Sequence, residues 1–387
     1  MAHIPYGRQD ISKEDIRAVI KVLESDWLTQ GPDIEEFEQA VADYCGAKYA
    51  VAVNSATSAL HIACMAAGVE QGDWMWTTPN TFVASANCGL YCGANVDFID
   101  IDKQTYNLSA AELEAKLLAG RLAEKLPKVV IPVHFSGQSC DMEAIAAIAK
   151  KYNFTVIEDA SHAIGGSYKD TKVGSCKYSD MAVFSFHPVK IVTTCEGGMI
   201  VTNRRDLYDK LIRLRSHGIT RCPDFMVEEA HGPWYYQQIE LGYNYRITDV
   251  QAALGTSQMK RIDTFVSRRS ELAKRYTKEL VDLPLILPYQ SQAAKSAWHL
   301  YVIQIDDYKC KKSRKQIFEE LRAKGIGVNV HYIPVHTQPY YKNMGFKYGD
   351  FPISERYYER AISIPMYYSL TDEEQTYVIQ SLYEVVK

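Results

Sequence analysis

The chain has 387 residues, of which 47% are apolar and 23% charged. That is the composition of a globular protein long enough to form two domains around a cleft. Its 43 Lys and Arg residues and 47 Asp and Glu residues give a net charge of -4, which argues against binding to nucleic acid or to an anionic membrane surface. The most apolar window, residues 50–69, contains Asn54 and His61 and does not suit a membrane span.

The nine cysteines and the histidines show no metal-binding spacing. The number of cysteines is odd and no Cys-x-x-Cys pair occurs, which is typical of structural thiols in a reducing cytoplasm. His331 and His336 are five residues apart in a segment with proline, out of register for two ligands on one helix. The first ten residues do not resemble a signal peptide. We therefore expect a cytoplasmic protein without a bound metal.

The first two-thirds of the chain alternates short apolar runs with helical patterns. Helices are expected at residues 57–67 and 142–152. Strands are expected at residues 49–54, 74–78, 96–99, 128–134, 154–158, 181–186 and 199–202. Such alternation predicts an α/β fold with a largely parallel sheet covered by helices on both faces.

Beyond about residue 262 the pattern changes. A charged helix is expected at residues 263–280, followed by a strand at 298–305, a helix at 313–324 and a strand at 327–332. This indicates a smaller α+β domain. We predict a large domain over residues 1–255 and a small C-terminal domain over residues 256–387.

An acid and a lysine each follow a predicted strand. Asp159 lies at the carboxyl end of one strand, and Lys190 follows the next in a turn marked by Pro188. Ligands bind at the carboxyl ends of strands in such sheets. Pyridoxal phosphate requires this pair, because a carboxylate keeps its pyridine nitrogen protonated and a lysine bonds to its aldehyde. The segment 54–58, between a strand and a helix, offers hydroxyl and N–H donors for the phosphate.

Other nucleotide-binding motifs do not occur. No Gly-x-Gly-x-x-Gly follows a strand, and no Gly-x4-Gly-Lys-Ser/Thr occurs anywhere in the chain. Neither dinucleotide binding nor a Walker-type phosphate site is supported.

Five motifs together resemble one enzyme family: NSATSAL (54–60), TTPNTFVA (77–84), EDASHAIG (158–165), SFHPVKIVTTCEGG (185–198) and GYNYRITDVQAALG (242–255). These segments are similar to the DegT/DnrJ/EryC/StrS sugar aminotransferases, pyridoxal-phosphate enzymes of fold type I. The resemblance implies a large domain with a mostly parallel seven-stranded sheet and a smaller α+β domain. Segments including IPYGRQD (4–10) and GPWYYQQIE (232–240) resemble more narrowly the branch that acts in pseudaminic acid biosynthesis.

The resemblance also implies roles for particular residues. The catalytic residues are Lys190, which binds the cofactor covalently, Asp159, which faces the pyridine nitrogen, and His162, which orients the ring. Further cofactor-binding residues are Phe82, stacked on the ring, and Thr57, Ser58, Ser185 and, from a neighbouring subunit, Asn244 at the phosphate. Tyr6, Gln30, His331 and Tyr332 match positions near the sugar nucleotide. Core packing of Phe82 and a structural role of His331 are the alternatives.

The resemblance further implies a reaction and its partners. Dehydratases of the same fold carry histidine in place of the lysine, so Lys190 favours an aminotransferase. We expect a homodimer with composite active sites that transfers the amino group of L-glutamate to C4 of a UDP-linked 4-keto-6-deoxy-N-acetylhexosamine. Alternatives are another UDP- or dTDP-4-keto-6-deoxy sugar, and a non-catalytic protein that binds sugar nucleotides.

Cys195 departs from the family pattern, because relatives usually carry glycine at this position. If the backbone there has positive φ, cysteine costs on the order of 1–2 kcal/mol. A thiol five residues from Lys190 also suggests sensitivity to oxidants, as a hypothesis.

Overall fold

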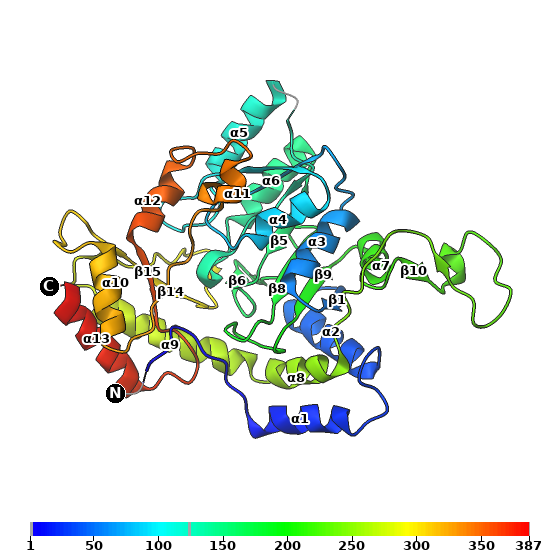
Figure 1. Ribbon diagram of the computed structural model, residues 1–387, viewed down its shortest axis with the longest axis horizontal. Coiled ribbons are helices and arrows are strands. Elements are labelled where there is room, and N and C mark those ends of the chain that lie inside the picture. The colour runs from blue at the N-terminus through cyan, green and yellow to red at the C-terminus, as the bar shows by residue number, and fades with distance from the viewer. Residues whose placement is uncertain (1–2, 123–124, 387) are drawn as a thin grey trace.

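The computed structural model describes residues 3–122 and 125–386. A seven-stranded sheet forms its centre (Figure 1). In spatial order its strands are β1 (Tyr49–Val53), β9 (Gly198–Thr202), β8 (Met181–Ser185), β5 (Thr155–Asp159), β4 (Val129–Val130), β2 (Trp74–Thr77) and β3 (Asn95–Phe98). Only β9 runs antiparallel to its two neighbours, and the remaining strand pairs are parallel. The prediction of a mostly parallel seven-stranded sheet is confirmed.

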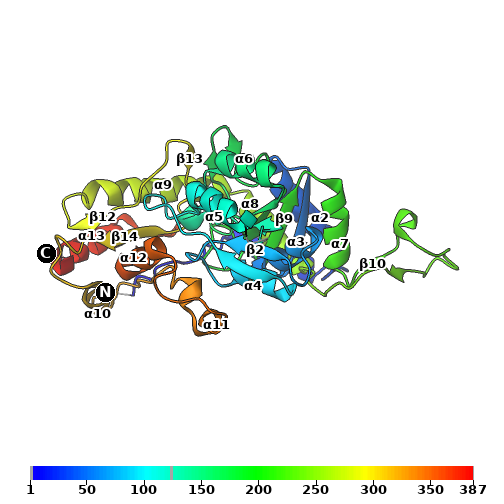
Figure 2. The ribbon, with the colours of Figure 1, turned by 90° about the horizontal axis from the view of Figure 1, so that it is seen from above.

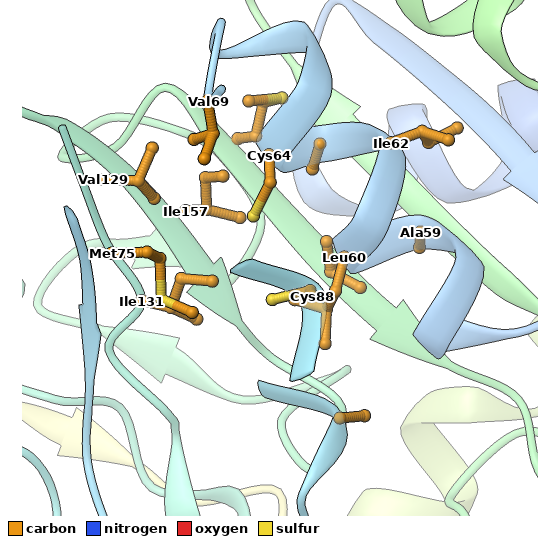
Figure 3. Packing of buried hydrophobic residues seen from close by; sticks show 14 of the residues in the cluster. Ala59, Leu60, Ile62, Cys64, Val69, Met75, Cys88, Val129, Ile131 and Ile157 are labelled. Carbon is orange, nitrogen blue, oxygen red and sulfur yellow. The ribbon is translucent and has the colours of Figure 1, made fainter. Parts of the chain in front are cut away.

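Alternate residues of the central strands pack into different cores, because successive side chains of a strand point to opposite faces. In β8, Met181 and Val183 join the core on one face, while Ala182 and Phe184 join the core on the other. The first face is covered by α3 (Ala56–Ala66), α4 (Ala84–Tyr91) and α7 (Arg205–Leu214). Figure 3 shows this core, where Leu60 and Cys64 of α3 lie next to Cys88 of α4 and Ile157 of β5.

The opposite face of the sheet is covered by four helices: α2 (Pro32–Cys45), α5 (Ala110–Leu122), α6 (Met142–Tyr152) and α8 (Asp249–Met259). Outside them, α1 (Lys13–Leu23) packs on α8. Short 3-10 helices occur at η1 (Phe135–Gly137), η2 (Pro223–Phe225) and η3 (Val335–Thr337). The result is a three-layer arrangement with the sheet in the middle (Figure 2).

A second, smaller core lies in the C-terminal part of the chain. Its antiparallel sheet consists of β12 (Leu285–Ile286), β14 (Tyr301–Ile305) and β15 (Ala361–Ile364). The helices of this part are α9 (Ile262–Glu279), α10 (Arg314–Ala323), α11 (Pro339–Lys342), α12 (Pro352–Arg360) and α13 (Asp372–Val386). A third sheet links the two parts, because β13 (Ala294–Lys295) pairs with β6 (Ser167–Tyr168), which pairs with β7 (Thr171–Lys172). The domain boundary after residue 255 stays a prediction.

Three expected strands differ from those observed. Residues 327–332 form no strand; only an isolated bridge joins Asn329 to Ser363. The backbone N–H groups of Val330 and Tyr332 donate instead to the side-chain oxygens of Asn329 and Asn80. The strand expected at 298–305 begins only at Tyr301, and the one expected at 128–134 comprises only Val129–Val130. At residues 329–332, side-chain hydrogen bonds thus take the place of strand pairing.

An arm projects from the body of the molecule at residues 219–240 (Figure 2). Its base is the pairing of β10 (Ile219–Thr220) with β11 (Gln237–Gln238). Val227 and Trp234 on the arm are 81% and 70% exposed. Across the described part of the chain, none of the helices has both the length and the apolar character needed to cross a membrane.

Candidate active site

The candidate site lies where β5 and β8 end. These strands are parallel neighbours, with Asp159 opposite Val183, so their carboxyl ends meet at one edge of the sheet. A cavity of about 540 Å³ opens there. Nine predicted residues line it: Tyr6, Thr57, Phe82, Asp159, His162, Ser185, Lys190, His331 and Tyr332.

Lys190 reaches the cavity from the loop that joins β8 to β9. The loop is closed on itself by hydrogen bonds from Thr194 N and Thr193 Oγ1 to the carbonyl of Phe186, each 3.0 Å. Burial lowers the pKa of Lys190 to about 8, although the charge of Asp159 opposes the shift. A substantial fraction of the amine is therefore neutral near pH 7–8, as a nucleophile or proton acceptor must be.

Asp159 is buried and held by two donors. Its Oδ2 accepts a hydrogen bond of 2.6 Å from Ser85 Oγ, and its Oδ1 accepts one of 3.1 Å from Ser161 N. Ser85 is in turn 2.7 Å from Thr81 Oγ1. Neither Ser85 nor Thr81 was predicted. Thr81 lies within the TTPNTFVA motif and Ser85 directly follows it. Their spacing of four residues is the only feature of the sequence that indicates a contact between them.

His162 is neutral and has a defined tautomer. Burial and the nearby charge of Lys190 hold its pKa well below the ordinary value. Its Nδ1 accepts a hydrogen bond from Ser136 N at 3.3 Å, so the ring proton is on Nε2, which lies 3.1 Å from the hydroxyl of Tyr332. This arrangement fixes the imidazole at the edge of the cavity.

The start of α3 forms a cradle suited to a phosphate. Thr57 and the N-cap residue Ser55 line the cavity beside Ser185, and the first N–H groups of the helix attract an anion. Gly198 permits the close approach of β9, because a Cβ there would lie 2.5 Å from the backbone of Ser55. Ser58 does not line the cavity, and its hydroxyl donates to Asn54 Oδ1 at 2.7 Å.

Phe82 is 59% exposed and lines the cavity. Core packing, the alternative interpretation of this residue, is therefore wrong. An exposed aromatic face beside the cavity suits a planar ligand.

Besides Ser58, two predicted residues lie outside the cavity of their own chain. Asn244 is exposed and pairs with Ser216. Gln30 follows Thr29, which forms a bridge with Thr248. The two residues are thus on adjoining segments, and neither lines the cavity that contains Lys190. Cavity residues that were not predicted include Ser161, Glu196, His299 and Asn329.

The sequence profile of the DegT/DnrJ/EryC1/StrS aminotransferase family matches residues 9–383. The chain belongs to this family. It is 39% identical, over 99% of its length and 98% of the relative, to the UDP-4-amino-4,6-dideoxy-N-acetyl-β-L-altrosamine transaminase of Campylobacter jejuni subsp. jejuni serotype O:2. Membership in this family makes the chain an aminotransferase, as Lys190 suggested.

Solved structures share the fold over the whole chain. Helicobacter pylori PseC, described as an aminotransferase in the biosynthesis of pseudoaminic acid, superposes with a TM-score of 0.89 at 32% identity, covering 99% of both chains. The PLP form of the putative sugar aminotransferase Spr1654 from Streptococcus pneumoniae has a TM-score of 0.88 at 28% identity, covering 99% of this chain and 98% of that one. Membership therefore implies pyridoxal phosphate, and the amine, carboxylate, aromatic face and anion cradle in the cavity fit this cofactor.

Cys195 is exposed and has a φ of 67°. This positive φ is the case in which cysteine was expected to cost stability, because a Cβ is strained in the left-handed region. We predict that Cys195→Gly raises the free energy of unfolding by about 0.5–1 kcal/mol, after the greater flexibility of glycine in the unfolded chain is subtracted. The measurement is the urea denaturation midpoint. Cys195→Ala retains a Cβ and serves as the control; equal midpoints for the two variants would contradict the prediction.

Proposed function

We propose that this enzyme transfers the amino group of L-glutamate to C4 of UDP-2-acetamido-2,6-dideoxy-β-L-arabino-hex-4-ulose, a step of pseudaminic acid biosynthesis. The observation that carries the proposal is the presence of Lys190 and Asp159 in one cavity beside the helix start of α3. The names of the Campylobacter transaminase and of Helicobacter PseC support the choice of sugar. Lysine at position 190, rather than histidine, supports transamination over dehydration.

The cavity residues have complementary roles toward the cofactor. Pyridoxal phosphate, when bound, supplies an electron sink for the carbon that exchanges the amino group. Lys190 would hold it covalently and Asp159 would face its ring nitrogen. Phe82 would cover one ring face and His162 would orient the ring edge. Thr57 and Ser185, together with the helix start that includes Ser58, would bind the phosphate.

Lys190 also moves the proton in this proposal. Lys190 Nζ would take the proton from the Cα of the amino donor and hold it for delivery later in the transfer. The pKa of about 8 places it near the working pH, where a general base is most effective. Lys190 would serve as the proton carrier in the same way when the keto-sugar is the acceptor.

The sugar nucleotide and the second subunit complete the proposal. Tyr6, His331 and Tyr332 line the cavity where the sugar would lie. In a cytoplasmic homodimer, Asn244 would reach the phosphate in the neighbouring chain. The bridge between Thr29 and Thr248, four residues after Asn244, supports a position of Gln30 on the same face as Asn244.

The role of Asp159 leads to a prediction. Asp159→Asn keeps the size of the side chain but removes its charge, so we expect kcat to fall by at least about a hundredfold while part of the cofactor stays bound. Steady-state kinetics and the absorbance of the cofactor measure the two effects. Asp97→Asn is the matched control, because Asp97 lies in the same sheet, pairs with Lys116 at 2.7 Å and does not line the cavity. Full activity of Asp159→Asn would contradict the assignment.

The proposed substrate is tested with a panel of UDP- and dTDP-linked 4-keto-6-deoxy sugars and L-glutamate. We expect the highest kcat/KM with the UDP-linked β-L-arabino sugar, and a product with an amine at C4 by mass spectrometry and NMR. Preference for a dTDP-linked sugar would reject the proposed substrate but retain the aminotransferase. No amino transfer to any sugar, with an unchanged cofactor spectrum in glutamate, would indicate a non-catalytic sugar-nucleotide-binding protein.

A further inference from the structure

One wall of the cavity is formed by histidines and an asparagine. His162 is bound at both ring nitrogens by Ser136 and Tyr332, and His331 Nδ1 lies 2.7 Å from Ser363 Oγ. These two imidazoles are therefore fixed by the protein itself. The other members of the wall are His299 and Asn329.

His299 differs from the other two histidines. It is 4% exposed, its ring lies 4.4 Å from that of His162, and its Nδ1 is enclosed without a hydrogen-bond partner. No hydrogen bond of Nε2 occurs within the described chain either. Because only Nδ1 is fully enclosed, Nε2 is the ring nitrogen left accessible to the cavity. A molecule in the cavity can therefore pair with Nε2, whereas the enclosed Nδ1 is out of its reach.

A buried guanidinium lies behind His299. Arg269 is 2% exposed, and its NH1 donates to the carbonyls of Trp298, His299 and Met366 at 2.9–3.2 Å. Across the described residues, no carboxylate lies within ion-pair distance of it. Burial lowers its pKa to about 10, which leaves it charged at neutral pH. An uncompensated buried cation gives this wall a positive potential that favours an anion.

The acidic residues that line the cavity do not neutralise the positive charge of Arg269. Asp159 accepts hydrogen bonds from Ser85 and Ser161. Glu196 lies 4.0 Å from His187, on the loop after β8. Neither is hydrogen-bonded to the histidines.

We propose that His299 and Asn329, backed by Arg269, form the subsite for a carboxylate of the amino donor. This inference rests on the proposed aminotransferase function and adds the recognition of the donor to it. The carboxylate would accept a hydrogen bond from His299 Nε2 and lie close to the Nδ2 of Asn329, which is 3.5 Å from His331 Nε2 and has a second N–H to donate. Its charge would balance that of Arg269.

The protonation state of the wall agrees with this role. Burial, with the neighbouring His162 and Lys190, keeps the pKa of His299 well below its ordinary value, and burial with Lys190 lowers that of His331 to about 3. Both rings are neutral at neutral pH. His299 can therefore donate a hydrogen bond without adding a positive charge that would compete with Lys190 for the carboxylate.

The test uses glutarate, a dicarboxylate without an amine, titrated into the holoenzyme by calorimetry. His299→Phe keeps the ring packed on His162 but removes both nitrogens, and we expect glutarate to bind at least about tenfold more weakly. His299→Gln restores a donor and should regain most of the affinity. KM for glutamate should rise in His299→Phe, while KM for the keto-sugar changes little. His61→Phe is the matched control, because His61 is buried on α3 outside the cavity.

Unchanged glutarate affinity in folded His299→Phe would overturn the subsite, as would equal loss in His61→Phe. If His299→Phe does not fold, Asn329→Ala replaces it, with the same expected loss and the same contradiction. The proposed sugar can fail independently: glutamate would then still alter the cofactor spectrum and glutarate would still bind through His299.

Discussion

The active site depends on one constraint, the parallel pairing of β5 with β8. Parallel neighbours end at the same edge of a sheet, so the acid that ends β5 and the lysine that follows β8 share a cavity. The same edge partly encloses Lys190, and this burial lowers its pKa to about 8 against the opposing charge of Asp159. The pairing of β5 with β8 thus has two effects. It brings Asp159 and Lys190 together, and it shields the amine of Lys190 from water.

The cavity is lined by both a charged acid and neutral histidines. Asp159 lines the cavity and is fixed by the hydroxyl of Ser85 and the N–H of Ser161. The lining also includes neutral imidazoles, and the buried Arg269 donates to the backbone carbonyl of one of them, His299. Such a distribution suits a reaction in which a cationic ring nitrogen faces the acid while an anionic donor approaches the histidines. The neutral state of the wall follows from its burial next to Lys190.

Local patterns predicted much of the site, and long-range packing accounts for the remainder. Asp159, Lys190 and the start of α3 follow apolar runs that end in turns, and α6 matches its expected range of 142–152. Ser85 could not be predicted as a partner of Asp159, because their contact requires α4 to pack over the end of β5. His299 was hidden inside an expected strand. In the structure Trp298 has a φ of 50° and Leu300 N donates to Ser136 O, so the chain turns there.

The central claim is that burial makes the amine of Lys190 reactive near neutral pH. The most direct test is the pH dependence of Lys190 acetylation by a trace reagent in the cofactor-free enzyme, followed by peptide mass spectrometry. The account predicts an apparent pKa of about 8 for Lys190, with exposed lysines of the same sample near the ordinary value of about 10.4. A Lys190 that titrates together with the exposed lysines would contradict it.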